Sequence, residues 1–138
     1  MLEREGLNNF CLEIAGDIQT KGKNSSGEKW QIGIQNPFDL NQIVKVVNLS
    51  GYAIATSGNY QKGKHIYNPK KDFKEVDEVA SVSVVASNIY DADIYATAIF
   101  AMGMNGVHFA ENNKEVAVYL IDKNGIAFMT SNFSNYVN

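Results

Sequence analysis

Asp93 and Thr97 are the residues of this chain whose types and spacing could most directly do chemistry. They lie in segment 92–98, shortly after the apolar run 82–86. A strand that leads into a helix beginning near Asp93 places both oxygen-bearing side chains on one side of that helix. A carboxylate and a hydroxyl suit a hard cation such as Mg²⁺. The spacing alone favours a structural explanation, because an acidic residue near a helix start is stabilised by the helix dipole without a metal.

The composition is that of an ordinary globular protein, long enough to bury a core. The 138 residues are 45% hydrophobic, carry a formal net charge of −3 and predict one domain over residues 1–138. The densest basic cluster, in segment 62–74, is interleaved with acidic residues, so we interpret it as a solvated loop. The charge distribution therefore argues against a nucleic-acid partner.

The single cysteine excludes an internal disulfide. Cys11 lies in the strand-like run 10–14, which favours a buried structural thiol over a nucleophile. Together with His65 and His108 it is too isolated for a zinc site. No apolar stretch approaches the length of a transmembrane segment, and residues 1–6 do not have the pattern of a signal peptide.

Hydrophobic periodicity and turn signals predict a sheet-rich chain with one long helix. Strands are expected at residues 9–14, 17–23, 29–35, 43–49, 52–56, 65–67, 79–86, 115–121 and 126–131. We expect strands 43–49 and 52–56 to pair around Ser50 and Gly51. We also expect strand 79–86 to be half-buried at one end, and residues 132–138 to form a frayed tail.

The helix is expected at residues 89–104, followed by a short helical or irregular stretch. Its apolar stripe combines Ile89, Ala92, Ala96, Ile99 and Met102 at helical spacing. Small residues in the stripe would permit close packing on a sheet. The predicted class is therefore α+β, a mostly antiparallel sheet with one main helix packed on it.

Several segments, in order, resemble the C-terminal half of the ApbE family, the FAD:protein FMN transferases. Segment 15–18 is similar to the family's Gly-Gly-Asp-Ile, and segment 30–37 to its Trp-x-Ile-Gly-Ile-x-x-Pro. Segments 55–60 and 65–69 are similar to Ala-Thr-Ser-Gly-x-Tyr and His-Ile-Ile-Asp-Pro. Segment 92–98 is similar to Ala-Asp-Ala-Leu-Ala-Thr-Ala. A single motif of this kind would not identify a family, but several motifs in the right order make the resemblance specific.

The resemblance implies a T-fold-like ApbE architecture and a transferase chemistry. In that family Mg²⁺ binds beside the pyrophosphate of FAD, and the matching motif makes Asp93 and Thr97 two of its ligands. The reaction moves FMN from FAD onto a Thr hydroxyl of an acceptor flavoprotein and releases AMP. A cation at the pyrophosphate offsets the charge that builds up as the phosphoanhydride is cleaved.

The resemblance also places residues near the flavin. His65 and Ile66 belong to the segment that borders the flavin site, and His65 could act as base toward the acceptor hydroxyl. The alternative for His65 is a loop histidine bonded to the backbone. Ser57 is a candidate cofactor contact beside a turn shaped by Thr56 and Gly58, and Asp17 is expected to order its hairpin.

The chain departs from the family pattern at Ala15, Asn68 and the pair Lys71-Asp72, which replace Gly, Asp and Thr-Gly. Residues 1–6 resemble the end of a family helix, so we expect the chain to begin within a family element. The Asp-Leu-Gly-x-x-x-Lys-Gly segment, which binds FAD in the family, has no counterpart here. The family is often exported and lipid-anchored, but the sequence leaves the compartment unknown.

Three functional interpretations follow. The chain could be a partial FMN transferase, inactive alone and completed by an N-terminal half. It could also be a non-catalytic flavin- or nucleotide-binding descendant, or a structural module that associates with itself. Apolar residues around the helix favour a homo-oligomer, since they occupy more than one face: Ile89, Ile94, Tyr95, Ile99, Phe100 and Phe109.

Overall fold

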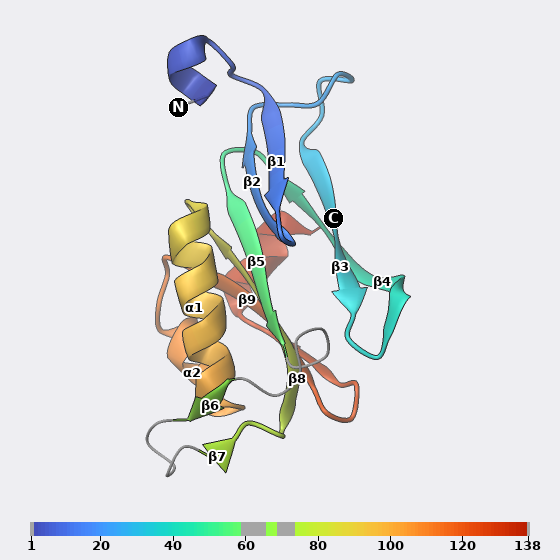
Figure 1. The fold of residues 1–138 in the computed structure, drawn as a ribbon, viewed down its shortest axis with the longest axis vertical. Helices are drawn as coiled ribbons and strands as arrows, with labels where there is room; N and C mark the ends of the chain where they lie inside the picture. The colour runs from blue at the N-terminus through green and yellow to red at the C-terminus, as the bar shows by residue number, and fades with distance from the viewer. Residues whose placement is uncertain (1, 59–65, 69–73, 138) are drawn as a thin grey trace.

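The computed structural model describes residues 2–58, 66–68 and 74–137 (Figure 1). In chain order the elements are the 3-10 helix η1 (Leu2–Glu5), β1 (Phe10–Ile14), β2 (Asp17–Lys21), β3 (Trp30–Asn36), β4 (Asp39–Leu49), β5 (Ala53–Gly58), β6 (Tyr67–Asn68), β7 (Lys74–Glu75), β8 (Val79–Ala86), α1 (Ile89–Met102), α2 (Asn105–Glu111), β9 (Ala117–Asp122), β10 (Ala127–Met129) and the 3-10 helix η2 (Ser131–Tyr136).

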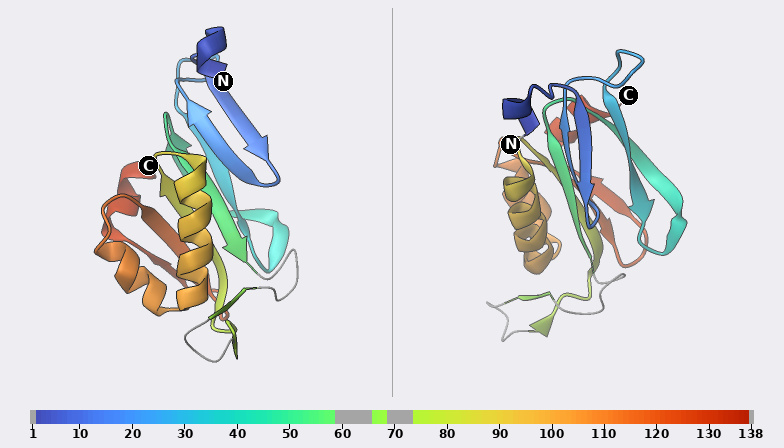
Figure 2. Two further views of the ribbon diagram at one scale, coloured as in Figure 1. Left: turned by 60° about the vertical axis from the view of Figure 1, so that its left-hand side comes forward. Right: turned by 45° about the horizontal axis from the view of Figure 1, so that its top comes forward.

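The main sheet has six antiparallel strands in the order β1-β2-β5-β8-β9-β10. Helices α1 and α2 cover one face of this sheet, and the β3–β4 hairpin covers part of the other (Figure 2). This arrangement confirms the predicted α+β class and the mostly antiparallel sheet with a helix packed on it. Among the described residues, no helix has the length and apolar character required to cross a membrane.

Alternation along the central strands produces two hydrophobic cores, one on each face of the sheet. On β5, Ala53 and Ala55 belong to the helix-side core, whereas Ile54 belongs to the hairpin-side core. On β8, Val84 and Val85 divide in the same way. Successive side chains of a strand point to opposite faces, so each central strand contributes to both cores.

Helix α1 is fixed at its start by a reciprocal cap. The Asn88 side chain accepts a hydrogen bond from the Asp91 backbone N–H at 3.0 Å, and its amide donates to the Asp91 carboxylate at 2.7 Å. This satisfies one of the otherwise unpaired N–H groups of the first turn. The helix ends at Gly103, whose φ of 66° suits glycine.

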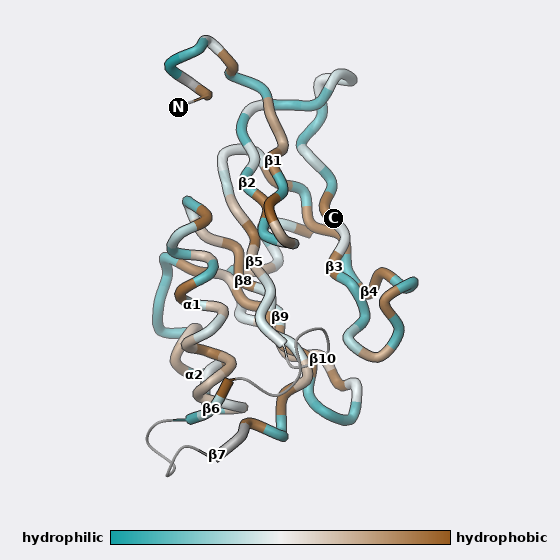
Figure 3. Tube along the Cα trace, viewed as in Figure 1, coloured by the Kyte–Doolittle hydropathy of each residue, from teal (hydrophilic) through white to brown (hydrophobic). Residues whose placement is uncertain are grey.

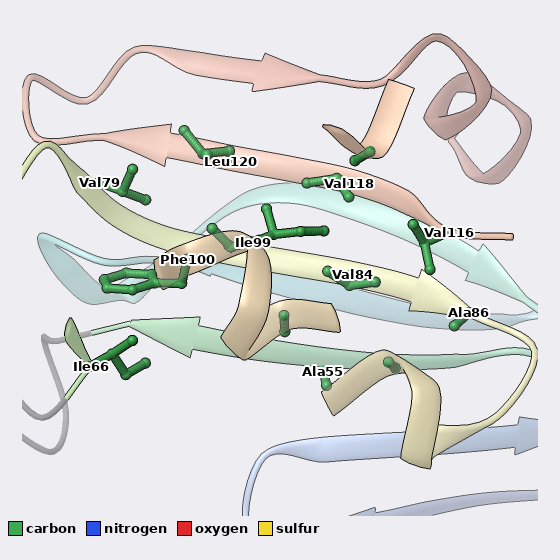
Figure 4. Packing of buried hydrophobic residues seen from close by; sticks show 14 of the residues in the cluster. Ala55, Ile66, Val79, Val84, Ala86, Ile99, Phe100, Val116, Val118 and Leu120 are labelled. Atoms are coloured by element: carbon green, nitrogen blue, oxygen red, sulfur yellow. The ribbon is translucent and has the colours of Figure 1, made fainter. Parts of the chain in front are cut away.

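Small residues let α1 approach the sheet closely. Ala92 and Ala96 are fully buried and belong, with Ala53 and Ala55 of β5, to the helix-side core. Figure 4 shows the helix lying over β5 and β8, with Ile99 and Phe100 among the side chains that fill the space between helix and sheet. The close packing predicted from the small residues of the stripe is therefore confirmed.

The predicted pairing of strands 43–49 and 52–56 was wrong. β4 pairs with β3, whereas β5 pairs with β2 and β8 in the main sheet. The chain therefore crosses from one layer to the other between Leu49 and Ala53. Packing decides this crossing, because Leu49 and Val47 of β4 are completely buried against the opposite face of the main sheet.

Two burial predictions were also wrong. β8 is buried along nearly its whole length, because helices cover one face and the hairpin-side core the other. The C-terminal segment is not frayed: η2 places Phe133 in the hairpin-side core, fully buried, with its ring centroid 5.4 Å from that of Tyr119. Burying this aromatic ring supplies the free energy that orders the segment.

Candidate functional site

Asp93 and Thr97 lie one turn apart on α1, and both side chains are exposed. Within the part of the chain that the structure describes, the Asp93 carboxylate has neither a hydrogen-bond partner nor an ion-pair partner. The structural explanation considered for Asp93 applies to Asp91 instead, because Asp91 is the acidic residue of the first turn and completes the cap with Asn88. Asp93 is thus available for a ligand.

Thr97 is connected to the sheet through Ser57. The Ser57 Oγ and Thr97 Oγ1 atoms lie 3.1 Å apart and form a hydrogen bond between β5 and α1. Ser57 is buried, with 9% of its surface exposed, whereas Thr97 lies at the surface. The two residues are 40 positions apart, so no local sequence pattern could reveal this contact.

The site lies where one edge of β5 is open. β2 pairs with only Ala53 and Ile54 of β5, so the stretch from Ala55 to Gly58 has no strand partner on that edge among the described residues. Figure 1 shows β2 ending partway along β5, with α1 beside the remainder. Thr97, which is bonded to Ser57 in this stretch, and Asp93, one turn earlier on α1, therefore lie near a part of β5 that no described strand covers on that edge.

A groove of about 710 Å³ lies on the opposite face of the sheet, between the β1–β2 and β3–β4 hairpins. Its lining includes Ile54 and Thr56 of β5 and Cys11 of β1. The predicted burial of Cys11 was wrong, because β1 is an edge strand and Cys11 is exposed. Residual burial and the nearby Glu13 carboxylate raise the pKa of its thiol, which disfavours a nucleophilic thiolate.

The predicted flavin-bordering residues are described only in part. His65 lies outside the described residues, so its assignment as base stays a prediction. Ile66 is buried, with 9% of its surface exposed, and packs in the helix-side core beside Phe100 (Figure 4). Its cofactor contact also stays a prediction, and the observed role of its side chain is to attach this segment to α1.

Ala15 occupies a position where the family pattern has glycine, and its backbone retains the conformation that glycine favours. Ala15 has a φ of 53°, and Gly16 next to it has a φ of 96°. These two residues form the turn between β1 and β2, and Asp17 begins β2. The left-handed conformation is costly for a residue with a Cβ atom, so Ala15 strains this turn.

The oxygen donors of Asp93 and Thr97 fit Mg²⁺ as an incomplete ligand set. Among the described residues, no group of three or more His, Cys, Asp or Glu side chains is arranged to hold a metal ion. Magnesium commonly binds one or two carboxylates, several waters and the phosphates of a substrate instead of a complete protein cage. One carboxylate and one hydroxyl beside an open edge match that kind of site.

Comparison with known proteins identifies the family. The ApbE family model matches residues 1–120. The chain is 30% identical over 139 residues to the FAD:protein FMN transferase of Escherichia coli K12, an alignment that covers 94% of this chain and 40% of that protein. It is 33% identical over 146 residues to the Haemophilus influenzae FAD:protein FMN transferase, covering 98% of this chain and 42% of that protein.

Solved structures agree in fold. The flavin transferase ApbE of Vibrio cholerae superposes with a TM-score of 0.84 at 32% identity, covering 99% of this chain and 47% of that chain. The apo flavinyl transferase ApbE of Pseudomonas stutzeri gives 0.83 at 26% identity, covering 99% and 44%. This chain belongs to the ApbE family. It spans about two-fifths of the length of the curated relatives it matches.

Proposed function

We propose that this chain supplies the metal- and pyrophosphate-binding part of an FAD:protein FMN transferase. The observation that carries the proposal is the pair Asp93 and Thr97, one turn apart and exposed beside the open edge of β5. The relatives' names support FAD as substrate and a protein as acceptor. Mg²⁺ is proposed from the chemistry of the two donors.

In the proposed reaction the acceptor Thr oxygen attacks the phosphorus of the FMN portion of FAD. The phosphoanhydride bond breaks, AMP leaves with the bonding electron pair, and the Thr proton passes to a base, the role predicted for His65. When bound, a divalent cation offsets negative charge on the pyrophosphate. Asp93 and Thr97 would hold the pyrophosphate side of FAD near α1 through that cation, and Ser57 lies directly behind Thr97.

We predict that the 138-residue chain alone does not transfer FMN and retains FAD weakly. Among the described residues, no cluster of His, Cys, Asp or Glu side chains adds to the two donors, and two donors make a weak site for a cation and for the pyrophosphate bound to it. The measurement is incubation with FAD, Mg²⁺ and an acceptor peptide that contains Thr, followed by in-gel flavin fluorescence under denaturing conditions. The full-length Escherichia coli relative serves as the positive control, and covalent labelling by this chain at a comparable rate would refute the prediction.

A self-associating module is the second candidate, supported by exposed apolar side chains on the hairpins. Of the residues expected to be bare around the helix, Ile99 and Phe100 are fully buried and Ile89 and Tyr95 pack against the core; only Ile94 and Phe109 are exposed. The exposed apolar residues of β1, β4 and the turn before β4 form a larger set: Leu12, Ile14, Phe38, Leu40, Ile43 and Val46. Figure 3 shows that hydrophobic and hydrophilic positions both occur along β1 and β4. Contiguous exposed apolar surface typically marks an interface, and four of these residues, Phe38, Leu40, Ile43 and Val46, lie on or directly before a single strand, β4.

We therefore predict a homo-oligomer, most simply a two-fold dimer that uses the hairpins more than α1. The expected result from size exclusion with light scattering is a dimer mass at micromolar concentration. Ile43→Asp, at an exposed position of β4, should shift the mass to that of a monomer, whereas Tyr90→Asp on α1 should not. A monomer for the unmodified chain would contradict the prediction.

A further inference from the structure

We infer that Ser57 is a positioning residue that orients the Thr97 hydroxyl toward a cation, an inference that rests on the proposed function. The sequence marks Ser57 as a candidate cofactor contact. The structure instead turns its side chain toward α1, where Oγ lies 3.1 Å from Thr97 Oγ1. Ser57 is buried and Thr97 exposed, so Ser57 lies behind Thr97 as seen from solvent.

The surroundings of Ser57 make a hydroxyl there costly unless it is paired. The helix-side core next to it is lined by small apolar residues, among them Ala55 on β5 and Ala92 and Ala96 on α1. A buried hydroxyl without a partner costs free energy, and alanine would fill the same position without that cost. The hydrogen bond to Thr97 compensates the buried Ser57 hydroxyl, and it connects that hydroxyl to a residue that is exposed at the surface.

The hydrogen-bonding capacity of a hydroxyl explains how Ser57 could orient the Thr97 side chain. A threonine hydroxyl has one hydrogen and two lone pairs, and it binds a cation through a lone pair. Either hydroxyl of this pair can donate, and we assign the donor role to Thr97: its hydrogen then points toward Ser57 Oγ, and its lone pairs are left free for a cation. Metal ligands in proteins are commonly oriented by such partners behind them.

Without Ser57, a competing hydrogen bond becomes available to Thr97. A helical threonine can donate to the backbone carbonyl three or four residues earlier, and the fourth residue before Thr97 is Asp93. In that alternative, Oγ1 of Thr97 points along α1 toward the Asp93 carbonyl instead of toward β5. The Thr97 side chain then populates two χ1 rotamers. Ser57 thus selects the rotamer in which the hydroxyl and the Asp93 carboxylate can act on one cation.

Another hydroxyl pair on β5 provides a matched control. Thr56, the neighbour of Ser57, points to the opposite face and bonds Ser83 of β8 at 2.8 Å. Both pairs connect β5 to another element, but Ser83 is completely buried inside the sheet and remote from α1's exposed face. Ser83→Ala therefore removes a comparable hydrogen bond without changing the orientation of Thr97.

The test measures Mn²⁺ binding to the full chain by paramagnetic broadening of the backbone amide signals of residues 93–97, with and without FAD. Ser57→Ala is expected to weaken apparent Mn²⁺ affinity about 10-fold, the lower end for partners of metal ligands. Thr97→Val should weaken it too, and adding Ser57→Ala to Thr97→Val should produce no further loss, because the two act as one unit. Ser83→Ala and Thr97→Ser, which keeps the hydroxyl, should bind as the unmodified chain does.

The outcomes separate this inference from the proposed function. Unchanged Mn²⁺ affinity in Ser57→Ala, with affinity lost in Asp93→Ala and Thr97→Val, overturns the positioning role alone. An undiminished effect of Ser57→Ala in the Thr97→Val background overturns it as well. Absence of broadening at residues 93–97 in the unmodified chain at millimolar Mn²⁺, with and without FAD, refutes the metal site itself and this inference with it.

Discussion

Asp93→Ala is expected to abolish metal-dependent FMN transfer in an enzyme that contains this chain. The suitable protein is a chimera in which the chain replaces the matching portion of the Escherichia coli relative. Lewis-acid stabilisation amounts to several kcal/mol, so the expected loss is about 100-fold or more in kcat/KM. The measurement is the rate of covalent flavin incorporation into an acceptor protein at saturating Mg²⁺.

Thr97→Ala should weaken the same reaction less, because water can replace a lost hydroxyl ligand more readily than a lost carboxylate. Asp91→Ala is the matched control, since Asp91 belongs to the helix cap and not to the proposed ligand pair. It should lower the free energy of unfolding by about 0.3–1 kcal/mol, the usual contribution of an acidic side chain in the first turn, and leave the transfer rate unchanged. A fully active Asp93→Ala chimera would eliminate the metal assignment.

Phe100→Ala is expected to cause the largest loss of stability of any single substitution proposed for this chain. Phe100 is fully buried, and its ring packs in the helix-side core beside Ile66 (Figure 4). Removing a buried phenylalanine ring costs about 3–5 kcal/mol, through lost burial and the cavity left behind. The measurement is urea unfolding of the isolated chain followed by circular dichroism.

Tyr90→Ala provides the stability control on the same helix. Tyr90 is 72% exposed, so its removal should change the free energy of unfolding by no more than about 0.5 kcal/mol. A loss below about 1 kcal/mol for Phe100→Ala would show that α1 is not fixed to the sheet by this side chain.

The sequence predicted the elements better than it predicted their partners. β1, β2, β3, β8 and α1 lie close to the predicted ranges, because each has a local signal: alternation, an Asn or Gly turn, or an apolar stripe. The chain crosses between layers after β4, and Phe133 is buried by η2; both depend on contacts between residues remote in sequence. No local pattern encodes such contacts. For this reason the sequence predicted a hairpin where the chain crosses after β4, and a frayed tail where Phe133 is buried.

In the candidate site, too, local features could be predicted from the sequence and contacts between distant residues could not. The spacing of Asp93 and Thr97 on one helix was predictable, because helical periodicity is a local property. The contact of Thr97 with Ser57 was not, since it depends on how α1 packs on β5. The helix-start role considered for Asp93 belongs to Asp91, two residues earlier, because Asn88 and Asp91 form the cap. Helix boundaries are less certain from sequence than helix existence.

The alternation of β5 between the two cores makes the site sensitive to strand register. A slip of one residue would exchange the faces of Thr56 and Ser57, taking the Ser57 hydroxyl away from Thr97. The same slip would move Ile54 into the narrow space beside α1 that Ala53 and Ala55 now fill. A chain with β5 out of register would therefore lose the packing of α1 together with the hydrogen bond between Ser57 and Thr97. The small residues that allow α1 to pack closely thus also disfavour a folded form with the wrong side chain behind Thr97.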